Sequence, residues 1–157
     1  MKAISILASI VVVLFAVGCG SGDDTNGTGT ADSGNEMQLT FDWDSCVYEG
    51  ATELAAGPTT LTFINASEEL AFVEIGSIPG DETAQDVIDY IGEEPSSKFH
   101  PRWTEEVAYK SISSGETFVW EGELEPAIHS VVCGVSKAED GVPTLYVWLG
   151  SVFTVTG

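Results

Sequence analysis

The chain of 157 residues has 25 acidic residues but only five lysine or arginine residues, which gives a formal net charge of −20. Such a charge repels phosphate groups and anionic lipid headgroups, so we expect no nucleic-acid partner. The acidic residues are scattered singly and in pairs, which favours a role in solubility over attraction of cations or of a basic partner.

The first 18 residues predict a secretory signal peptide. Lys2 supplies the positive charge, and the apolar stretch from Ile4 to Val17 is shorter than the roughly 20 residues that span a bilayer as a helix. The sequence Ala16-Val17-Gly18-Cys19 resembles a lipobox, in which a lipid is attached to the cysteine. We therefore expect a lipid anchor on Cys19 at the cell membrane, with the protein facing the periplasm or the cell exterior. The alternative is an ordinary secretory signal with an incidental cysteine.

Residues 19–36 predict a flexible tether, because no large apolar side chain occurs between Gly20 and Glu36. The remaining residues, 37–157, are enough for one hydrophobic core and too few for two, so we expect a single domain.

Short strands dominate this predicted domain. Apolar and polar residues alternate from Leu39 to Asp44, and the same period recurs at 60–63, 117–120 and 152–155. The segments 70–75 and 127–133 are apolar on both faces, so we expect both to be deeply buried. About six to eight such strands, separated by turn residues, predict a sandwich of two sheets.

Residues 80–92 instead predict a short amphipathic helix. Asp81 or Thr83 can cap this helix, acidic residues occupy its first turn, and Gly92 can end it. Its apolar residues follow helical spacing: Ala84, Val87, Ile88 and Ile91. Residues 93–104 predict an irregular loop that returns the chain to the sandwich.

The chain has three cysteines. If Cys19 carries the lipid, Cys46 and Cys133 remain in an oxidising compartment, and we expect them to form one disulfide.

Taken in order, these segments resemble a cupredoxin, the blue-copper β-sandwich. The resemblance covers nearly all of 37–157, and it implies a mainly β, cupredoxin-like Greek-key sandwich with one short inserted α-helix. The inserted helix and Pro101-Arg102-Trp103 are also similar to segments of secreted cupredoxin-like lipoproteins. The strand and turn patterns that carry the resemblance lie in 46–50, 54–57, 60–65, 114–117, 124–126, 131–133 and 149–155.

The resemblance places Cys133 where a cupredoxin has its copper cysteine, but the other ligands are missing. Blue copper needs two imidazoles and a thiolate, usually with a weak axial methionine. The segment after the Asn turn, 68–72, has no histidine, and Thr144 stands where the second histidine is expected. Neither histidine nor methionine occurs after Cys133. We therefore expect no copper and no other cofactor.

An atypical metal-binding or electron-transfer site is the alternative, and its candidate ligands are His100, His129 and Cys133. His129 and Cys133 share strand parity, but four residues of extended strand separate them by about 13 Å, too far for one ion. His100 lies in the predicted loop after the helix. Acidic pairs such as Asp42 and Asp44 lack the spacing of a known calcium loop.

No nucleophile has a partner base placed by the sequence, so we expect no enzyme. Trp43 and Trp120 are expected in the core, whereas Trp103 and Trp148 are expected in or beside loops and are candidates for ligand contact. The sequence thus predicts a membrane-anchored extracytoplasmic lipoprotein with a non-catalytic domain that binds a protein or small-molecule partner without copper.

Overall fold

The computed structural model describes residues 35–157. The predicted signal peptide, Cys19 and the tether as far as residue 34 lie outside the described residues. Among the described residues, no helix is long and apolar enough to cross a membrane. The described elements are β1 (Asn35–Phe41), β2 (Cys46–Glu49), β3 (Glu53–Ala55), β4 (Gly57–Asn65), β5 (Ala71–Ile78), α1 (Ala84–Ile91), β6 (Glu105–Ile112), β7 (Thr117–Leu124), β8 (Ala127–Glu139) and β9 (Val142–Thr156).

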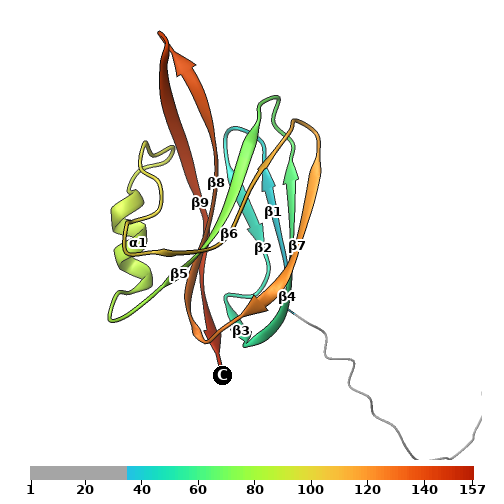
Figure 1. Ribbon diagram of the computed structural model, residues 1–157, viewed down its shortest axis with the longest axis vertical. Helices are drawn as coiled ribbons and strands as arrows, with labels where there is room; N and C mark the ends of the chain where they lie inside the picture. Colours follow the sequence, from blue (N-terminus) through green and yellow to red (C-terminus); the bar gives the residue numbers. More distant parts are fainter. Residues whose placement is uncertain (1–34) are drawn as a thin grey trace, which may run out of the picture. The chain divides into compact units, whose positions relative to one another are not determined.

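The strands form two sheets that face each other (Figure 1). One sheet has four strands in the order β2-β1-β4-β7, and the other has five in the order β3-β9-β8-β5-β6. Most neighbouring strands are antiparallel, but β1 runs parallel to β4 and β3 runs parallel to β9. The mainly β sandwich with one short inserted helix that the sequence predicts is therefore confirmed.

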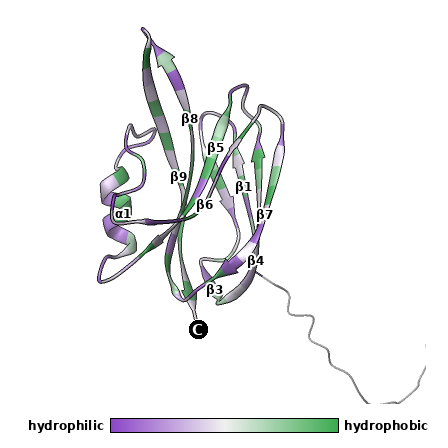
Figure 2. Ribbon diagram, in the orientation of Figure 1, coloured by the Kyte–Doolittle hydropathy of each residue, from purple (hydrophilic) through white to green (hydrophobic). Residues whose placement is uncertain are grey.

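The apolar faces of both sheets form the core between them. β1 and β4 alternate strictly, with Leu39, Phe41, Leu61 and Phe63 at most 1% exposed. β5 and the first half of β8 are buried on both faces, because α1 and the segment 93–104 cover the outer face of the five-stranded sheet. Figure 2 shows hydrophobic residues within the strands of both sheets, and both hydrophobic and hydrophilic residues on α1.

The helix α1 has the predicted caps. The backbone N–H of Thr83 donates to the Asp86 carboxylate at 2.7 Å, and Thr83 Oγ1 accepts from the backbone N–H of Asp86 at 3.3 Å, which together make a capping box. The side-chain and backbone hydrogen bonds from Thr83 lower the pKa of Asp86. Gly92, with φ 73°, ends the helix in a conformation that suits glycine.

The Asn turn contains Asn65, a buried residue whose side chain forms a hydrogen-bonded hub between two turns of the sandwich. Asn65 Nδ2 lies 2.8 Å from the carbonyl oxygen of Glu69, 3.0 Å from that of Ile112 and 3.1 Å from that of Ser113. Its Oδ1 accepts from the backbone N–H of Ser67 at 3.1 Å and from the Ser67 hydroxyl at 2.7 Å. One side chain therefore ties the turn after β4 to the turn after β6.

The structure differs from the predicted boundaries at the start and end of β1. The strand begins at Asn35, before the predicted boundary at residue 37, because the Asn35 side chain donates to the carbonyl oxygen of Ala55 at 2.7 Å and its backbone pairs with Thr59. It ends at Phe41 instead of continuing to residue 44, because Trp43 has φ 80° and lies in a turn.

The structure also corrects the second half of the predicted strand pattern. β6 was not predicted, because it is an edge strand whose side chains are mostly exposed and show little alternation. β8 and β9 form one long hairpin that turns at Asp140 and Gly141, both with positive φ. Gly141 belongs to this turn, and Val142 and Pro143 are the first two residues of β9.

Candidate functional site

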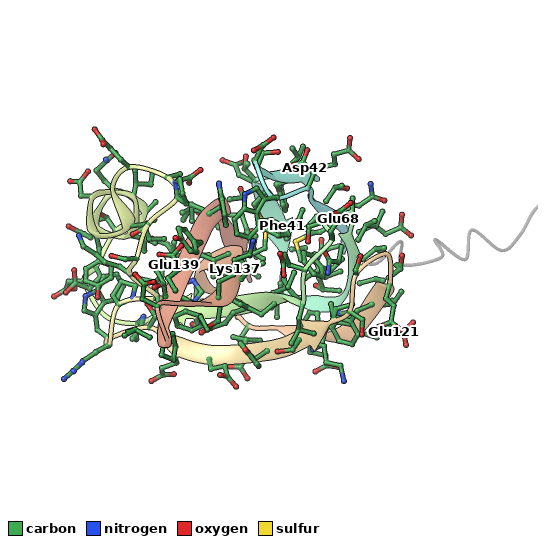
Figure 3. All side chains as sticks on the ribbon, turned by 90° about the horizontal axis from the view of Figure 1, so that it is seen from above. Phe41, Asp42, Glu68, Glu121, Lys137 and Glu139 are labelled. Atoms are coloured by element: carbon green, nitrogen blue, oxygen red, sulfur yellow. A yellow bond between two sulfur atoms is a disulfide. The ribbon has the colours of Figure 1, made fainter. Side chains whose placement is uncertain are left out.

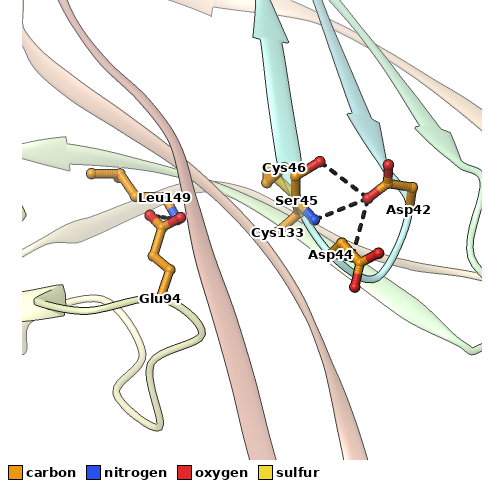
Figure 4. The surroundings of a disulfide bond; sticks show 7 residues. All are labelled: Asp42, Asp44, Ser45, Cys46, Glu94, Cys133 and Leu149. Carbon is orange, nitrogen blue, oxygen red and sulfur yellow. Dashed lines mark hydrogen bonds between the residues drawn. A yellow bond between two sulfur atoms is a disulfide. The ribbon is translucent and has the colours of Figure 1, made fainter.

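A disulfide joins the two sheets through Cys46 of β2 and Cys133 of β8 (Figure 4). Their Cα atoms are 6.0 Å apart, which is usual for a disulfide. Cys133 is fully buried and Cys46 is 8% exposed. The predicted pairing is confirmed, and it leaves no thiolate at the position that the resemblance assigns to the copper cysteine.

The hairpin β8–β9 has no ligand loop after the cysteine. Cys133 lies in the middle of β8, where it pairs with Trp148 of β9. Thr144, which stands in place of the second copper histidine, pairs with Lys137 further along the same ladder. Since β8 continues past Cys133 as a regular strand, Thr144 is carried away from the cysteine.

His100 belongs to a buried polar set on the outer face of the five-stranded sheet. Its Nε2 lies 2.9 Å from Ser130 Oγ of β8, and its Nδ1 lies 2.9 Å from Glu74 Oε1 of β5. All three residues are at most 8% exposed. Despite this short distance, Nδ1 makes no hydrogen bond, and the other carboxylate oxygen of Glu74, Oε2, also lacks a hydrogen-bond partner.

Glu74, His100 and Ser130 have the order of contacts of a catalytic triad, but the set is closed to a substrate. Ser130 is fully buried beneath residues 93–104, which we call the strap. The strap itself carries His100. Moving it aside to admit a substrate would therefore take the base away from the serine hydroxyl.

The strap is fastened to the sheet at two further points. Ser96 and Val147 of β9 exchange two backbone hydrogen bonds of 2.8 Å. Glu94 Oε1 accepts from the backbone N–H of Leu149 at 2.8 Å, next to the bulge where the β8–β9 register shifts (Figure 4). The buried His100 set is the third fastening, and its role in the structure is to hold the strap.

His129 lies on the opposite, inner face of β8. Its ring stacks on Phe153 with centroids 5.6 Å apart, and its Nε2 donates to the carbonyl oxygen of Glu125 at 3.1 Å. Burial lowers the pKa of His129, and the bond to Glu125 offsets part of this effect. A cavity of about 270 Å³ beside the ring is lined by Ser77, Glu105, Glu106, Val107, Glu123, Leu124, Glu125 and His129. Nδ1 has no partner, but it is buried and not open to this cavity.

The structure does not bring together the three residues of the alternative metal site. Ser130 and His129 are neighbours on β8 and point to opposite faces, so His100, which contacts Ser130, lies across the sheet from His129. Cys133 is taken up by the disulfide. Within residues 35–157, no group of three or more His, Cys, Asp or Glu side chains is arranged to hold a metal ion.

Of the two tryptophans predicted to contact a ligand, Trp148 lies within a strand of the core and Trp103 lies in the strap. Trp148 was expected in or beside a loop, and this is wrong: it lies within β9, is only 4% exposed and packs edge-on against Phe41 with centroids 5.1 Å apart. Trp103 lies in the strap and is partly buried against the apolar cluster that contains Val87 and Val132. Trp120, expected in the core, packs against its border and remains partly exposed.

Trp43 is held in an unusual turn between β1 and β2. Its φ of 80° is rare for a residue with a side chain. Asp42 Oδ1 fixes the turn, because it accepts hydrogen bonds from Asp44 N at 3.1 Å, Ser45 N at 2.9 Å and Ser45 Oγ at 3.1 Å (Figure 4). The indole of Trp43 packs against Trp148 with centroids 5.9 Å apart.

A cleft of about 330 Å³ opens beside this indole, and we call it the Trp43 cleft. Lys137 Nζ lies 3.8 Å from the centroid of the Trp43 ring and 2.8 Å from Glu69 Oε1. Seen from above, Asp42, Glu68 and Lys137 lie around Phe41 (Figure 3). The cleft is lined by Asp42, Trp43, Ala66, Ser67, Glu68, Glu69 and Lys137. This site could not be predicted from the sequence, because its residues come from three separate turns and strands.

The two sheets, with their mixture of parallel and antiparallel pairs and the Asn turn, form a mainly β sandwich of the kind that the resemblance to cupredoxins implies. Among solved structures, the chain is similar to dithionite-reduced auracyanin, a cupredoxin from the photosynthetic bacterium Roseiflexus castenholzii. The two share 18% identity over 78% of this chain and 98% of the auracyanin chain, with a TM-score of 0.43. The likeness concerns the fold alone. No family model matches the sequence, and no curated protein matches it.

Proposed function

We propose that the protein is a lipid-anchored extracytoplasmic lipoprotein whose cupredoxin-like domain binds a protein or a small ligand without copper and without catalysis. The observation that carries the proposal is the buried disulfide between Cys46 and Cys133. A blue-copper site needs a cysteine thiolate, and a cysteine in a disulfide offers none. The positions that would supply the histidine ligands hold other residues.

The proposed anchor is the lipid on Cys19, inferred from the signal sequence and the lipobox-like residues before it. The described part of the chain begins at Asn35, the first residue of β1, and the Trp43 cleft follows the other end of the same strand. This cleft is the surface that we propose for binding partners outside the cell membrane.

Catalysis is not part of the proposal, because the one hydrogen bond between a serine and a histidine side chain among the described residues lies beneath the strap. Metal binding by His100, His129 and Cys133 together is not part of it either. The two histidines lie on opposite faces of one sheet, and the sulfur of Cys133 is bonded to Cys46.

The test uses the full-length protein, extracted from membranes of the expressing cells in detergent. Metal analysis should give far less than one copper or zinc ion per chain, and added copper should produce no intense visible band of a copper–thiolate bond. One stoichiometric copper or zinc ion in the purified protein would contradict the proposal.

The anchor is tested separately by Cys19→Ala. This variant should lose the attached lipid and leave the membrane fraction, whereas the neighbouring Ser21→Ala variant should stay there. Membrane retention of Cys19→Ala to the same extent as Ser21→Ala would contradict the lipid anchor.

A further inference from the structure

The Trp43 cleft already holds a positively charged group. The ammonium of Lys137 lies over the face of the Trp43 indole at 3.8 Å and contacts the Glu69 carboxylate at 2.8 Å. An aromatic face together with a carboxylate is the arrangement that recognises organic ammonium groups, because the negative face of the ring and the anion both attract the cation. The cation in this case is supplied by the chain itself.

The cleft has the volume and the negative charge to hold an organic cation in place of the Lys137 ammonium. Its volume of about 330 Å³ is at the lower end of the range for small-molecule sites. Three carboxylates line it, from Asp42, Glu68 and Glu69, against the single ammonium of Lys137. An added cation therefore meets an excess of negative charge both in the cleft and over the whole chain, whose net charge is −20.

Lys137 can leave this position at little cost. Its side chain is 35% exposed and that of Glu69 is 44% exposed, so water and salt screen their attraction. Lys137 lies near the free end of the β8–β9 hairpin, where it can turn its side chain toward solvent without disturbing the core.

We propose that the Trp43 cleft is a binding site for an organic ammonium group, and that Lys137 occupies the place of this group in the unliganded protein. The ligand is either a small alkylammonium compound or the lysine side chain of a partner protein, and the chemistry at the cleft is the same for both. The inference rests on the proposed function, since it names the ligand class of the displayed domain.

The experiment titrates the oxidised full-length protein and its variants with tetramethylammonium chloride, and in a second arm with Nα-acetyl-lysine amide. Binding is followed by NMR through the backbone N–H signals of the cleft residues 66–69, which every variant keeps, and through the indole N–H signal of Trp43 where it is present. Sodium chloride keeps the ionic strength constant. The variant Lys137→Met removes the resident cation, which acts as a tethered competitor at an effective concentration of millimolar or more. We expect Lys137→Met to bind at least one of the two probes about tenfold more tightly than the unaltered chain does.

Three further variants identify the site. Adding Glu69→Gln or Trp43→Leu to Lys137→Met should remove the gained affinity, and Glu69→Gln does so without altering the packing of the indole. Lys110→Met is the matched control, because Lys110 Nζ also lies over an aromatic ring, that of Phe118 at 5.8 Å, but outside the cleft. This control should bind as weakly as the unaltered chain.

The arm that binds identifies the source of the ammonium group: tetramethylammonium points to a small quaternary compound, and acetyl-lysine amide points to a partner's lysine. If Lys137→Met binds neither probe more tightly than Lys110→Met does, the inference is overturned. That result would leave the metal and lipid tests of the proposed function unaffected.

Discussion

Cys46 and Cys133 connect the four-stranded sheet to the five-stranded sheet through the core, although 87 positions separate them in the sequence. The double variant Cys46→Ala/Cys133→Ala should lower the free energy of unfolding by about 2–4 kcal/mol, mainly because the unfolded chain regains the freedom of a long loop. Denaturant unfolding measures this loss. Reducing the unaltered protein should give nearly the same loss, and equal stability in all three samples would show that the disulfide contributes nothing.

Replacing Asn65 tests the buried hub between the turns. Asn65→Asp places a carboxylate against the three carbonyl oxygens that now accept from Nδ2, so we expect a loss of about 3–4 kcal/mol in unfolding free energy. The control is Asn35→Ala, because the Asn35 amide also bonds a backbone carbonyl but lies at the exposed start of β1. The control should lose about 1 kcal/mol or less. Similar losses in both variants would refute the hub.

Ser130→Ala tests whether the His100 set fastens the strap. The substitution leaves His100 Nε2 buried without a partner, so we expect a loss of roughly 1–3 kcal/mol and faster amide hydrogen exchange within 96–104. Ser151→Ala is the matched control, because its hydroxyl makes only a 3.4 Å contact with the carbonyl of Val152. The control should change stability by at most about 0.5 kcal/mol. Unchanged exchange in the strap of Ser130→Ala would contradict this role.

The lowered pKa of His129 should make the free energy of unfolding depend on pH. Burial holds its pKa in the folded protein below the usual value of 6.5, so the unfolded chain binds this proton more readily. The contribution of His129 to the free energy of unfolding is therefore complete above about pH 6.5 and is lost as the pH falls toward the folded-state pKa. Within this range, the free energy of unfolding decreases by at most about 1.4 kcal/mol per pH unit. His129→Phe keeps an aromatic ring against Phe153 and removes the proton. Unfolding free energies measured from pH 7.5 downward should fall less steeply for this variant, and equal slopes would exclude His129 as the cause.

Hydrophobic patterning identified the central strands and the helix, because in these elements burial follows the backbone period. Leu39 and Phe41 of β1 are buried as their alternation predicts, and Thr83 caps α1 as its position before the apolar residues predicts. Hydrophobic patterning did not identify the strand whose side chains are mostly exposed to solvent. The edge strand β6 has mostly exposed side chains, and its sequence therefore carries little periodic signal.

The candidate sites were harder to predict, because they depend on contacts between distant residues. Trp43 continues the alternation of β1, but the hydrogen bonds to Asp42 Oδ1 turn the chain there and direct the indole to the cleft. Its partner Lys137 comes from the other sheet, 94 positions further along the chain. The contact between His100 and Ser130 spans 30 positions and requires the strap to cross the sheet, which no local pattern shows.

Thiol labelling and mass measurement show whether Cys133 is available to copper. The full-length protein is unfolded in denaturant with an alkylating reagent, once without and once after reduction. We expect no labelled cysteine before reduction, because the proposed lipid would block Cys19 and because Cys46 is paired with Cys133. We expect two labelled cysteines after reduction. Labelling of both Cys46 and Cys133 without reduction would show that the disulfide is absent and would restore Cys133 as a candidate metal ligand.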